Sequence, residues 1–175
     1  GGSVIDWVMS DHNCSVGDAV VWLGGEYHIE ATGFDPKVYA DKKQIRAIMK
    51  EVVTFYHSQL TPEIRAYLNE RGLTDETIDE FKIDYAPPGG DALRQHMKSL
   101  GHSSNDLLAT GFFHSAKSRA YDHYQDRIIF PYQLYDEFVY SIGRLPPIDA
   151  VERHKSDEGK YKKHLIHSEK YPYVS

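Results

Sequence analysis

Two segments late in the chain combine alternating apolar residues with an arginine. Arg127 stands at the start of one segment, Asp126–Pro131, and Arg144 closes the other, Phe138–Arg144. The period of two predicts a pair of short strands joined by a turn at Tyr135–Glu137. In an antiparallel pair of similar length, the start of one strand and the end of its partner lie at the same edge. We therefore expect the two guanidinium groups to share one anion.

The local sequence around Lys160, Arg144 and Arg71 suggests how each of these cations would be positioned. Lys160 comes directly before Tyr161, in a stretch where basic residues outnumber acids. Arg144 follows Gly143; a glycine lets the backbone approach a ligand closely, and a guanidinium grips phosphate at two points. Arg71 closes an expected helix, where the helix dipole alone also favours a cation. These residues favour a phosphate-bearing ligand, with solvated or ion-paired side chains as the alternative.

The elements that would hold these cations are mainly helical. Apolar residues recur every three or four positions from Tyr39 to Leu60, which predicts a long amphipathic helix. Serine and threonine caps, proline starts and glycine stops mark the other helices. Their expected ranges are 4–8, 15–23 with Gly24-Gly25 as the stop, 62–71, 74–81, 91–100 and 104–110, with a short extended segment at 83–85. Helices followed by a late strand pair predict an α+β fold, mostly helical with a small antiparallel sheet or hairpin late in the chain.

The composition limits the kinds of ligand and setting. The 175 residues carry a net charge of −6, and all of it comes from residues 1–36, which hold six acids and no Lys or Arg. A local basic surface further along the chain is compatible with phosphate binding. Cys14 is the only cysteine, which excludes an internal disulfide and a cysteine-based zinc cluster and fits a reducing, intracellular setting. No apolar run approaches the roughly 18 residues that span a bilayer, so no membrane partner is expected.

Taken together, these segments resemble the catalytic core of bacterial-type (DnaG-like) DNA primases. The resemblance runs nearly from end to end, and it is carried by short motifs rather than by one long match. The motifs are the Tyr67-Leu68-Asn69-Glu70-Arg71-Gly72-Leu73 segment with its downstream Ala86-Pro87-Pro88-Gly89, the strand Arg127-Ile128-Ile129-Phe130-Pro131, the pair Gly143-Arg144, the pair Lys160-Tyr161, and the opening Gly1–Met9, which is similar to the segment after the family's zinc ribbon.

The resemblance implies roles for five residues. Arg71 takes the position of an arginine that holds single-stranded template, and Arg144 and Lys160 take positions that face the catalytic cleft. Arg127 matches the arginine at the start of the strand and is expected to bind nucleic acid in support, with an ion pair to a neighbouring aspartate as the alternative. Lys170 falls near a second family lysine, although the spacing after Tyr161 departs from the family pattern.

The same resemblance implies a domain order and an activity. Residues 1–36 are expected to follow a zinc ribbon, 37–151 to form the N-terminal subdomain of the catalytic core, and 152–175 to be a basic connector to a metal-binding Toprim domain. The implied enzyme is a DNA primase, which makes an RNA primer from ribonucleotides on single-stranded DNA at the replication fork in the cytoplasm. A replicative helicase is an expected partner.

The expected cofactors lie outside this chain. Mg²⁺ or Mn²⁺ would be held by the acids of the Toprim domain and Zn²⁺ by the ribbon, so the chain alone is expected not to polymerise. No metal site is predicted in the chain itself, because the spacing of His154, His164 and His167 fits no closed zinc set.

Two other kinds of protein fit parts of the sequence. The helices on either side of Arg71-Gly72-Leu73 resemble a helix-turn-helix, which would make the chain a non-catalytic DNA-binding module. The second of these helices carries four acids between Thr74 and Glu80, and these would repel phosphate. The acidic first 36 residues, with Trp7 and Trp22, instead suggest a protein-interaction domain of a replication protein.

Overall fold

The structure is a computed structural model that describes residues 2–116, 119–134, 137–146 and 159–165. Contacts within the chain divide it into two compact units, Gly1–Gln44 and Ile45–Ser175. The boundary between the units lies within a helix, whereas the sequence-based division was placed after residue 36. The second unit contains both sheets and all the candidate site residues that the structure describes.

The N-terminal unit consists of two capped helices and the beginning of a third. The side chain of Ser3 accepts a hydrogen bond from the backbone of Asp6, and Ser15 does the same for Asp18, as the sequence predicts for the second helix. The expected stop at Gly24-Gly25 is wrong: the helix continues to Tyr27, and His28, whose φ is 53°, is its C-cap. Glycine inside a helix costs only about 1 kcal/mol, so it does not end a helix by itself. The helices are α1 (Val4–His12), α2 (Val16–Tyr27) and α3 (Pro36–Ser58).

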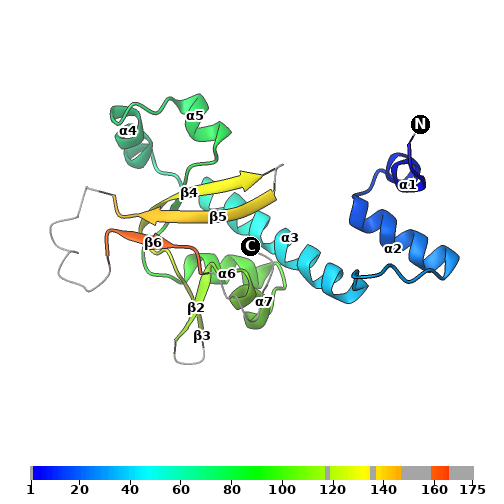
Figure 1. Ribbon diagram of the computed structural model, residues 1–175. Coiled ribbons are helices and arrows are strands. Elements are labelled where there is room, and N and C mark those ends of the chain that lie inside the picture. Colours follow the sequence, from blue (N-terminus) through cyan, green and yellow to red (C-terminus); the bar gives the residue numbers. More distant parts are fainter. Residues whose placement is uncertain (1, 117–118, 135–136, 147–158, 166–175) are drawn as a thin grey trace. The chain divides into compact units, whose positions relative to one another are not determined.

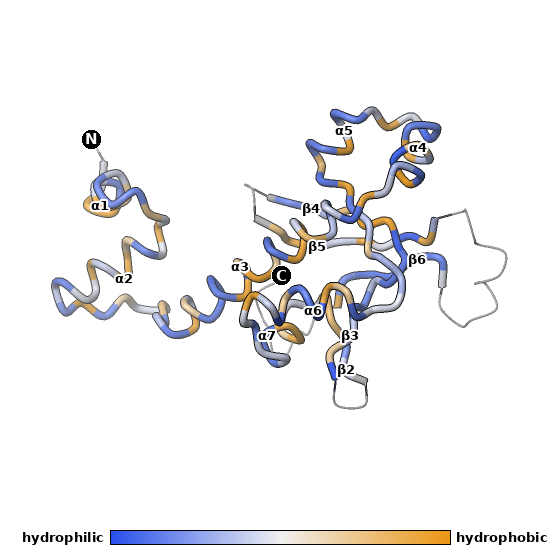
Figure 2. The backbone as a smooth tube through the Cα atoms, turned by 180° about the vertical axis from the view of Figure 1, so that it is seen from behind, coloured by the Kyte–Doolittle hydropathy of each residue, from blue (hydrophilic) through white to orange (hydrophobic). Residues whose placement is uncertain are grey.

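The second unit begins within α3 and continues through four shorter helices. Hydrophobic and hydrophilic residues alternate along α3 in Figure 2, as expected for a helix with one apolar face. Thr61 and Thr74 cap the next two helices as predicted, and Gly72, with φ of 91°, separates them. The helices are α4 (Pro62–Glu70), α5 (Asp75–Glu80), α6 (Ala92–Ser99) and α7 (Ser104–Ala109).

Two antiparallel sheets complete the α+β fold, which confirms the predicted fold class. The larger sheet has the strand order β1-β4-β5-β6, and the smaller one pairs β2 with β3. The pair β4–β5 is the strand pair that the sequence predicted. The sequence did not predict the β2–β3 pair or the addition of β6. The strands are β1 (Asp84–Ala86), β2 (Phe113–Ala116), β3 (Arg119–Asp122), β4 (Arg127–Leu134), β5 (Glu137–Arg144) and β6 (Tyr161–Lys163).

The larger sheet is covered differently on its two faces. On one face, Ile129 packs into a cluster with α3, α6 and α7. On the other face, Ile128 packs against Ile64 and Leu68 of α4 and Ile78 of α5. Figure 1 accordingly shows α4 and α5 on one side of the β4–β5 ribbon and α6 and α7 on the other. We call the Ile128 side the α4–α5 face of the sheet. Among the helices described, none is long and apolar enough to cross a membrane.

Candidate nucleic-acid interface

The strand register places Arg127 and Arg144 on opposite faces of the sheet. Arg144 is paired with Ile128, so these two side chains share the α4–α5 face, and Arg127, one residue earlier, points to the other face. Arg127 is 1% exposed, and its guanidinium donates to the carbonyls of Tyr124 and Gln125, both at 3.1 Å, and of Gly159 at 3.2 Å. The expectation that the two arginines share one anion is therefore wrong. Arg127 positions the strand ends instead.

Gly143 does not make room for a ligand. A Cβ atom built on it would lie 2.3 Å from Cδ1 of Tyr124 and 3.1 Å from Cδ of Arg127. The Tyr124 ring is fully buried, and its hydroxyl is hydrogen-bonded to Oγ of Ser141 at 2.7 Å. The missing side chain thus admits a core tyrosine on the face opposite Arg144. This corrects the sequence-based explanation of the glycine–arginine pair.

Arg144 lies on the α4–α5 face at the junction of three strands. Its cross-strand neighbours are Ile128 on β4 and Tyr161 on β6. Its Nε is buried and has no hydrogen-bond partner among the residues described. Arg144 is half-buried and has no ion pair with a carboxylate among the described residues, so its guanidinium is suited to binding an anion.

Lys160 lies near Arg144, where β5 ends and β6 begins. Its carbonyl accepts a hydrogen bond from the backbone N–H of Leu145. This bond holds the residue before β6 beside the residue that follows β5. Its ammonium nitrogen lies 5.7 Å from the centroid of the Tyr161 ring, which is the cross-strand neighbour of Arg144. The structure thus brings Arg144 and Lys160 together around one exposed tyrosine.

Arg71 ends α4 and is exposed. Its backbone N–H caps the helix by binding the carbonyls of Tyr67 and Leu68. Because α4 packs on the same sheet face that carries Arg144, the helix pair with Arg71 and the cations of the sheet edge belong to one side of the domain.

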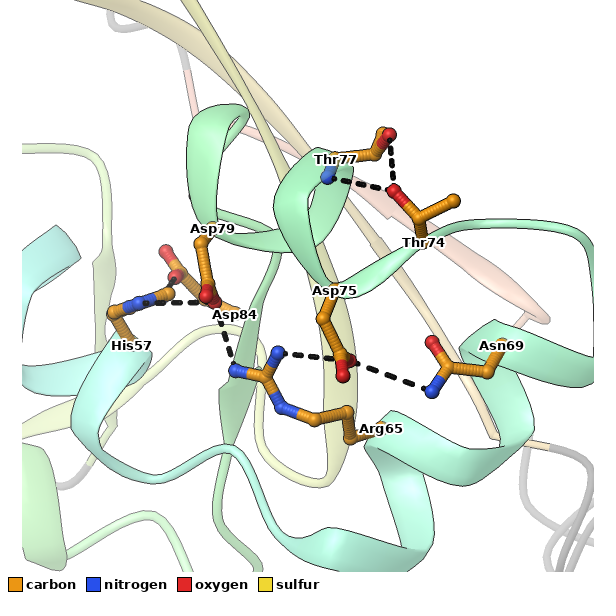
Figure 3. Close-up of polar contacts among 8 residues, drawn as sticks. All are labelled: His57, Arg65, Asn69, Thr74, Asp75, Thr77, Asp79 and Asp84. Carbon is orange, nitrogen blue, oxygen red and sulfur yellow. Dashed lines mark hydrogen bonds and ion pairs between the residues drawn. The ribbon is translucent and has the colours of Figure 1, made fainter.

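A network of ion pairs holds the helix pair together and fixes it to the core (Figure 3). Arg65 on α4 contacts Asp75 at 3.1 Å and Asp79 at 2.8 Å, both on α5. His57 at the end of α3 lies 3.0 Å from Asp84 on β1 and 3.9 Å from Asp79. Two of the four acids that would repel phosphate are thus bound by Arg65. Beyond the spacing of opposite charges, no local pattern indicates this pairing.

Burial sets the titration of the network. The carboxyl of Asp84 is fully buried, and burial raises its pKa to about 7 against the opposing effect of the His57 hydrogen bond. The hydrogen bond to Asp84 raises the pKa of His57 above its ordinary value. Both groups therefore hold a proton to higher pH in the folded protein than they would in water.

The remaining predictions concern Lys170 and metal ions. Lys170 lies outside the residues that the structure describes. Within the described ranges, no group of three or more His, Cys, Asp or Glu side chains is arranged to hold a metal ion.

Comparison with known proteins gives matches over most of the chain. A family model described as the DNA primase catalytic core, N-terminal domain, matches residues 54–162. The DNA primase of Deinococcus radiodurans is 32% identical over 133 residues, which are 74% of this chain and 23% of that protein. The DNA primase of Rickettsia felis is 29% identical over 153 residues, which are 82% of this chain and 25% of that protein. The chain thus spans about a quarter of the length of these relatives.

Solved primase structures have the same fold. The RNA polymerase domain of Mycobacterium tuberculosis primase, in complex with double-stranded DNA that has a 6-nucleotide overhang, matches with a TM-score of 0.61 and 25% identity over 71% of this chain and 39% of that chain. A DnaG primase catalytic domain bound to ssDNA matches with a TM-score of 0.57 and 27% identity, over 73% of this chain and 39% of that one. The Aquifex aeolicus primase, with zinc-binding and RNA polymerase domains, shares the fold at a TM-score of 0.60 and 19% identity, over 94% of this chain and 39% of that one.

The fold is an α+β domain whose antiparallel sheet exposes cations and aromatic side chains at one edge, a class suited to contact with nucleic-acid strands. The chain belongs to the DNA primase family, in which it corresponds to the N-terminal domain of the catalytic core.

Proposed function

We propose that this chain is the part of a DNA primase that binds the single-stranded DNA template and helps to position the primer end and the incoming ribonucleotide. Arg71 contacts the template backbone, Arg144 and Lys160 act beside the nucleotide or primer end, and Arg127 supports them from within the core. Lys170 is a further candidate contact to nucleic acid. The complete enzyme is then a DNA-directed RNA polymerase that acts in the cytoplasm at the replication fork.

One observation carries this proposal. Arg144 has no ion pair with a carboxylate among the described residues, and it shares its sheet face with the helix pair that bears Arg71. Two other arginines of this unit are paired with carboxylates, Arg65 with two aspartates and Arg94 with Asp91 at 2.6 Å. A guanidinium kept free of carboxylates retains its charge for phosphate.

The metal chemistry of primer synthesis does not belong to the described residues. A divalent ion such as Mg²⁺ or Mn²⁺ neutralises phosphates and activates the attacking hydroxyl in this kind of reaction. The described side chains offer no acidic cluster that fits such an ion. We infer that the acids come from a Toprim domain, that Zn²⁺ belongs to a zinc ribbon, and that this chain contributes cations and a binding wall. The chain alone is then inactive in polymerisation.

The helix-turn-helix alternative is not favoured. The second helix of the pair, α5, has only six residues, four of them acidic. The helix contains no Lys or Arg, so it presents no cation with which to enter a groove.

Binding to labelled DNA tests the proposal. We expect weak, salt-sensitive binding that favours a single strand over a duplex, measured by fluorescence anisotropy. Arg71→Ala and Arg144→Ala should each weaken single-strand binding about 5- to 30-fold, since a charge-assisted contact contributes about 1–2 kcal/mol. Lys98→Ala, which removes an exposed lysine on α6, is the matched control and should bind like the wild type. Equal or tighter binding of duplex, or unchanged binding by both arginine variants, contradicts the proposal.

A second function is favoured by one observation on the N-terminal unit. Trp7 is 59% exposed, and Tyr27 and Ile29 are also more than half exposed, in a segment without any Lys or Arg up to Pro36. Exposed apolar side chains among acids fit a contact with another protein, and a replicative helicase is the candidate. Titration with purified helicase should change the fluorescence of Trp7, and Trp7→Ser should weaken the complex. Unchanged binding by that variant contradicts the assignment.

A further inference from the structure

Three large apolar side chains are exposed on the strands that the structure describes. They are Tyr132 on β4, Ile142 on β5 and Tyr161 on β6, with exposed fractions of 57%, 38% and 56%. Strand residues that face a core are usually covered, as Ile128 and Ile129 are in this sheet. An uncovered apolar row on a sheet therefore indicates a binding surface.

The register places all three on the α4–α5 face and in one line. Tyr132 and Ile142 are diagonal neighbours across β4 and β5, because Phe130 is the direct partner of Ile142. Ile142 and Tyr161 are diagonal neighbours across β5 and β6 in the same sense, because Arg144 is the direct partner of Tyr161. Each diagonal step is about 7–8 Å. We call Tyr132, Ile142 and Tyr161 the diagonal row.

Cations flank the diagonal row on both sides. Arg144 lies beside Tyr161 on one side, and Lys163, which is exposed and paired with Ile142, lies on the other. Between Arg144 and the β-bulge at Tyr132/Gln133, the positions of β4, β5 and β6 that share this face carry no carboxylate. Charge thus favours a polyanion, and the tyrosines offer ring faces to flat, stackable groups.

We propose that the diagonal row is a stacking platform for the bases of a single-stranded nucleic acid, with Tyr132 as a base-binding residue beyond the cationic edge and Lys163 as a phosphate contact. The inference rests on the proposed function and extends it. The proposed function assigns phosphate contacts to this face of the sheet, and the inference adds a site for the bases. It predicts that the strand crosses the sheet from the Arg144 edge towards Tyr132. Bases of any identity would be accepted, since every base has a ring face.

Stacking and charge can be separated with two ligands of equal length. One is a labelled oligothymidylate, and the other is an abasic strand with the same number of phosphates, each titrated into the complete 175-residue chain and followed by fluorescence anisotropy. Tyr132→Ala should weaken oligothymidylate binding about tenfold, since a base stacked on an aromatic ring contributes about 1–3 kcal/mol. It should leave abasic-strand binding unchanged, and Tyr132→Phe should bind like the wild type because the ring is kept.

Two matched variants complete the experiment. Tyr27→Ala removes a tyrosine of similar exposure, 61%, from the other unit and should bind both strands like the wild type. Lys163→Gln should weaken both strands alike and reduce the salt dependence of binding, as expected for one lost phosphate contact. The effect of Tyr132→Ala on folding should be small because the side chain is exposed, and circular dichroism checks this.

The outcomes separate the inference from the proposed function. If Arg144→Ala weakens single-strand binding and Tyr132→Ala does not, the platform is overturned and the proposed function stands. If Tyr132→Ala weakens both strands equally, the tyrosine does not act by stacking and the platform is likewise overturned. If the wild-type chain binds neither strand at low salt, the proposed function fails and the inference fails with it.

Discussion

Gly143→Ala tests the close packing behind the strand that carries Arg144. The new methyl group would lie 2.3 Å from Cδ1 and 2.8 Å from Cε1 of the buried Tyr124 ring, which is closer than non-bonded carbon atoms approach. The ring must move, and it can do so only by disturbing its hydrogen bonds to the carbonyl of Ser141 at 3.0 Å and to Oγ of the same residue.

The magnitude follows from these two effects. Overpacking a full core costs about 1–3 kcal/mol, and each disturbed hydrogen bond adds about 1 kcal/mol. We therefore expect Gly143→Ala to lower the free energy of unfolding by about 3–5 kcal/mol, and the Tm by about 6–20 °C. Urea unfolding followed by far-ultraviolet circular dichroism measures the change.

A second glycine near the same strands serves as the control. A Cβ atom on Gly159 would have Tyr161 O, at 3.8 Å, as its nearest contact, and the carbonyl that accepts from Arg127 is kept. Gly159→Ala should change the unfolding free energy by less than about 0.5 kcal/mol. If Gly143→Ala is as mild as this control, the reasoning about Tyr124 is refuted.

Further predictions concern the ion pairs and caps of the same unit. Because burial raises the pKa of Asp84 to about 7, the folded state holds more protons than the unfolded state between about pH 4 and 7. Asp84 therefore lowers the free energy of unfolding as the pH rises through that range. In Asp84→Asn, the free energy of unfolding, measured with urea, should depend less on pH. Arg127→Lys should cost about 3 kcal/mol, since an ammonium cannot serve three carbonyls in the geometry of a guanidinium; a loss below about 1 kcal/mol contradicts this. Ser103→Ala removes the cap bonded to Asp106 and should lower the Tm by about 2–4 °C. An unchanged Tm would show that this cap does not stabilise α7.

Local signals predicted most of the helices and the central strand pair. Thr61-Pro62 and Thr74 marked two helix starts correctly, because capping depends on neighbours a few residues away. The β2–β3 pair and β6 were missed because their strands have only three or four residues and little alternation. Their pairing, β2 with β3 and β6 with β5, depends on contacts that no local pattern indicates.

The candidate site shows the same limit. The residue types at Arg71, Arg144 and Lys160 could be selected from the sequence, but the face to which each side chain points could not. A shift of one residue in strand register moves a side chain to the opposite face, which is why the shared anion of Arg127 and Arg144 was wrong. The reason for Gly143 also required the distant Tyr124 ring, which no local pattern indicates.

The salt dependence of single-strand binding tests the central claim most directly. The logarithm of the binding constant should fall linearly with the logarithm of the salt concentration, with a slope of about −0.7 for each phosphate contact. The double variant Arg71→Ala/Arg144→Ala should bind more weakly and reduce the steepness of that slope by about 1.4. A double variant with the slope and affinity of the wild type would contradict the claim that these two cations hold the phosphate backbone of a single strand.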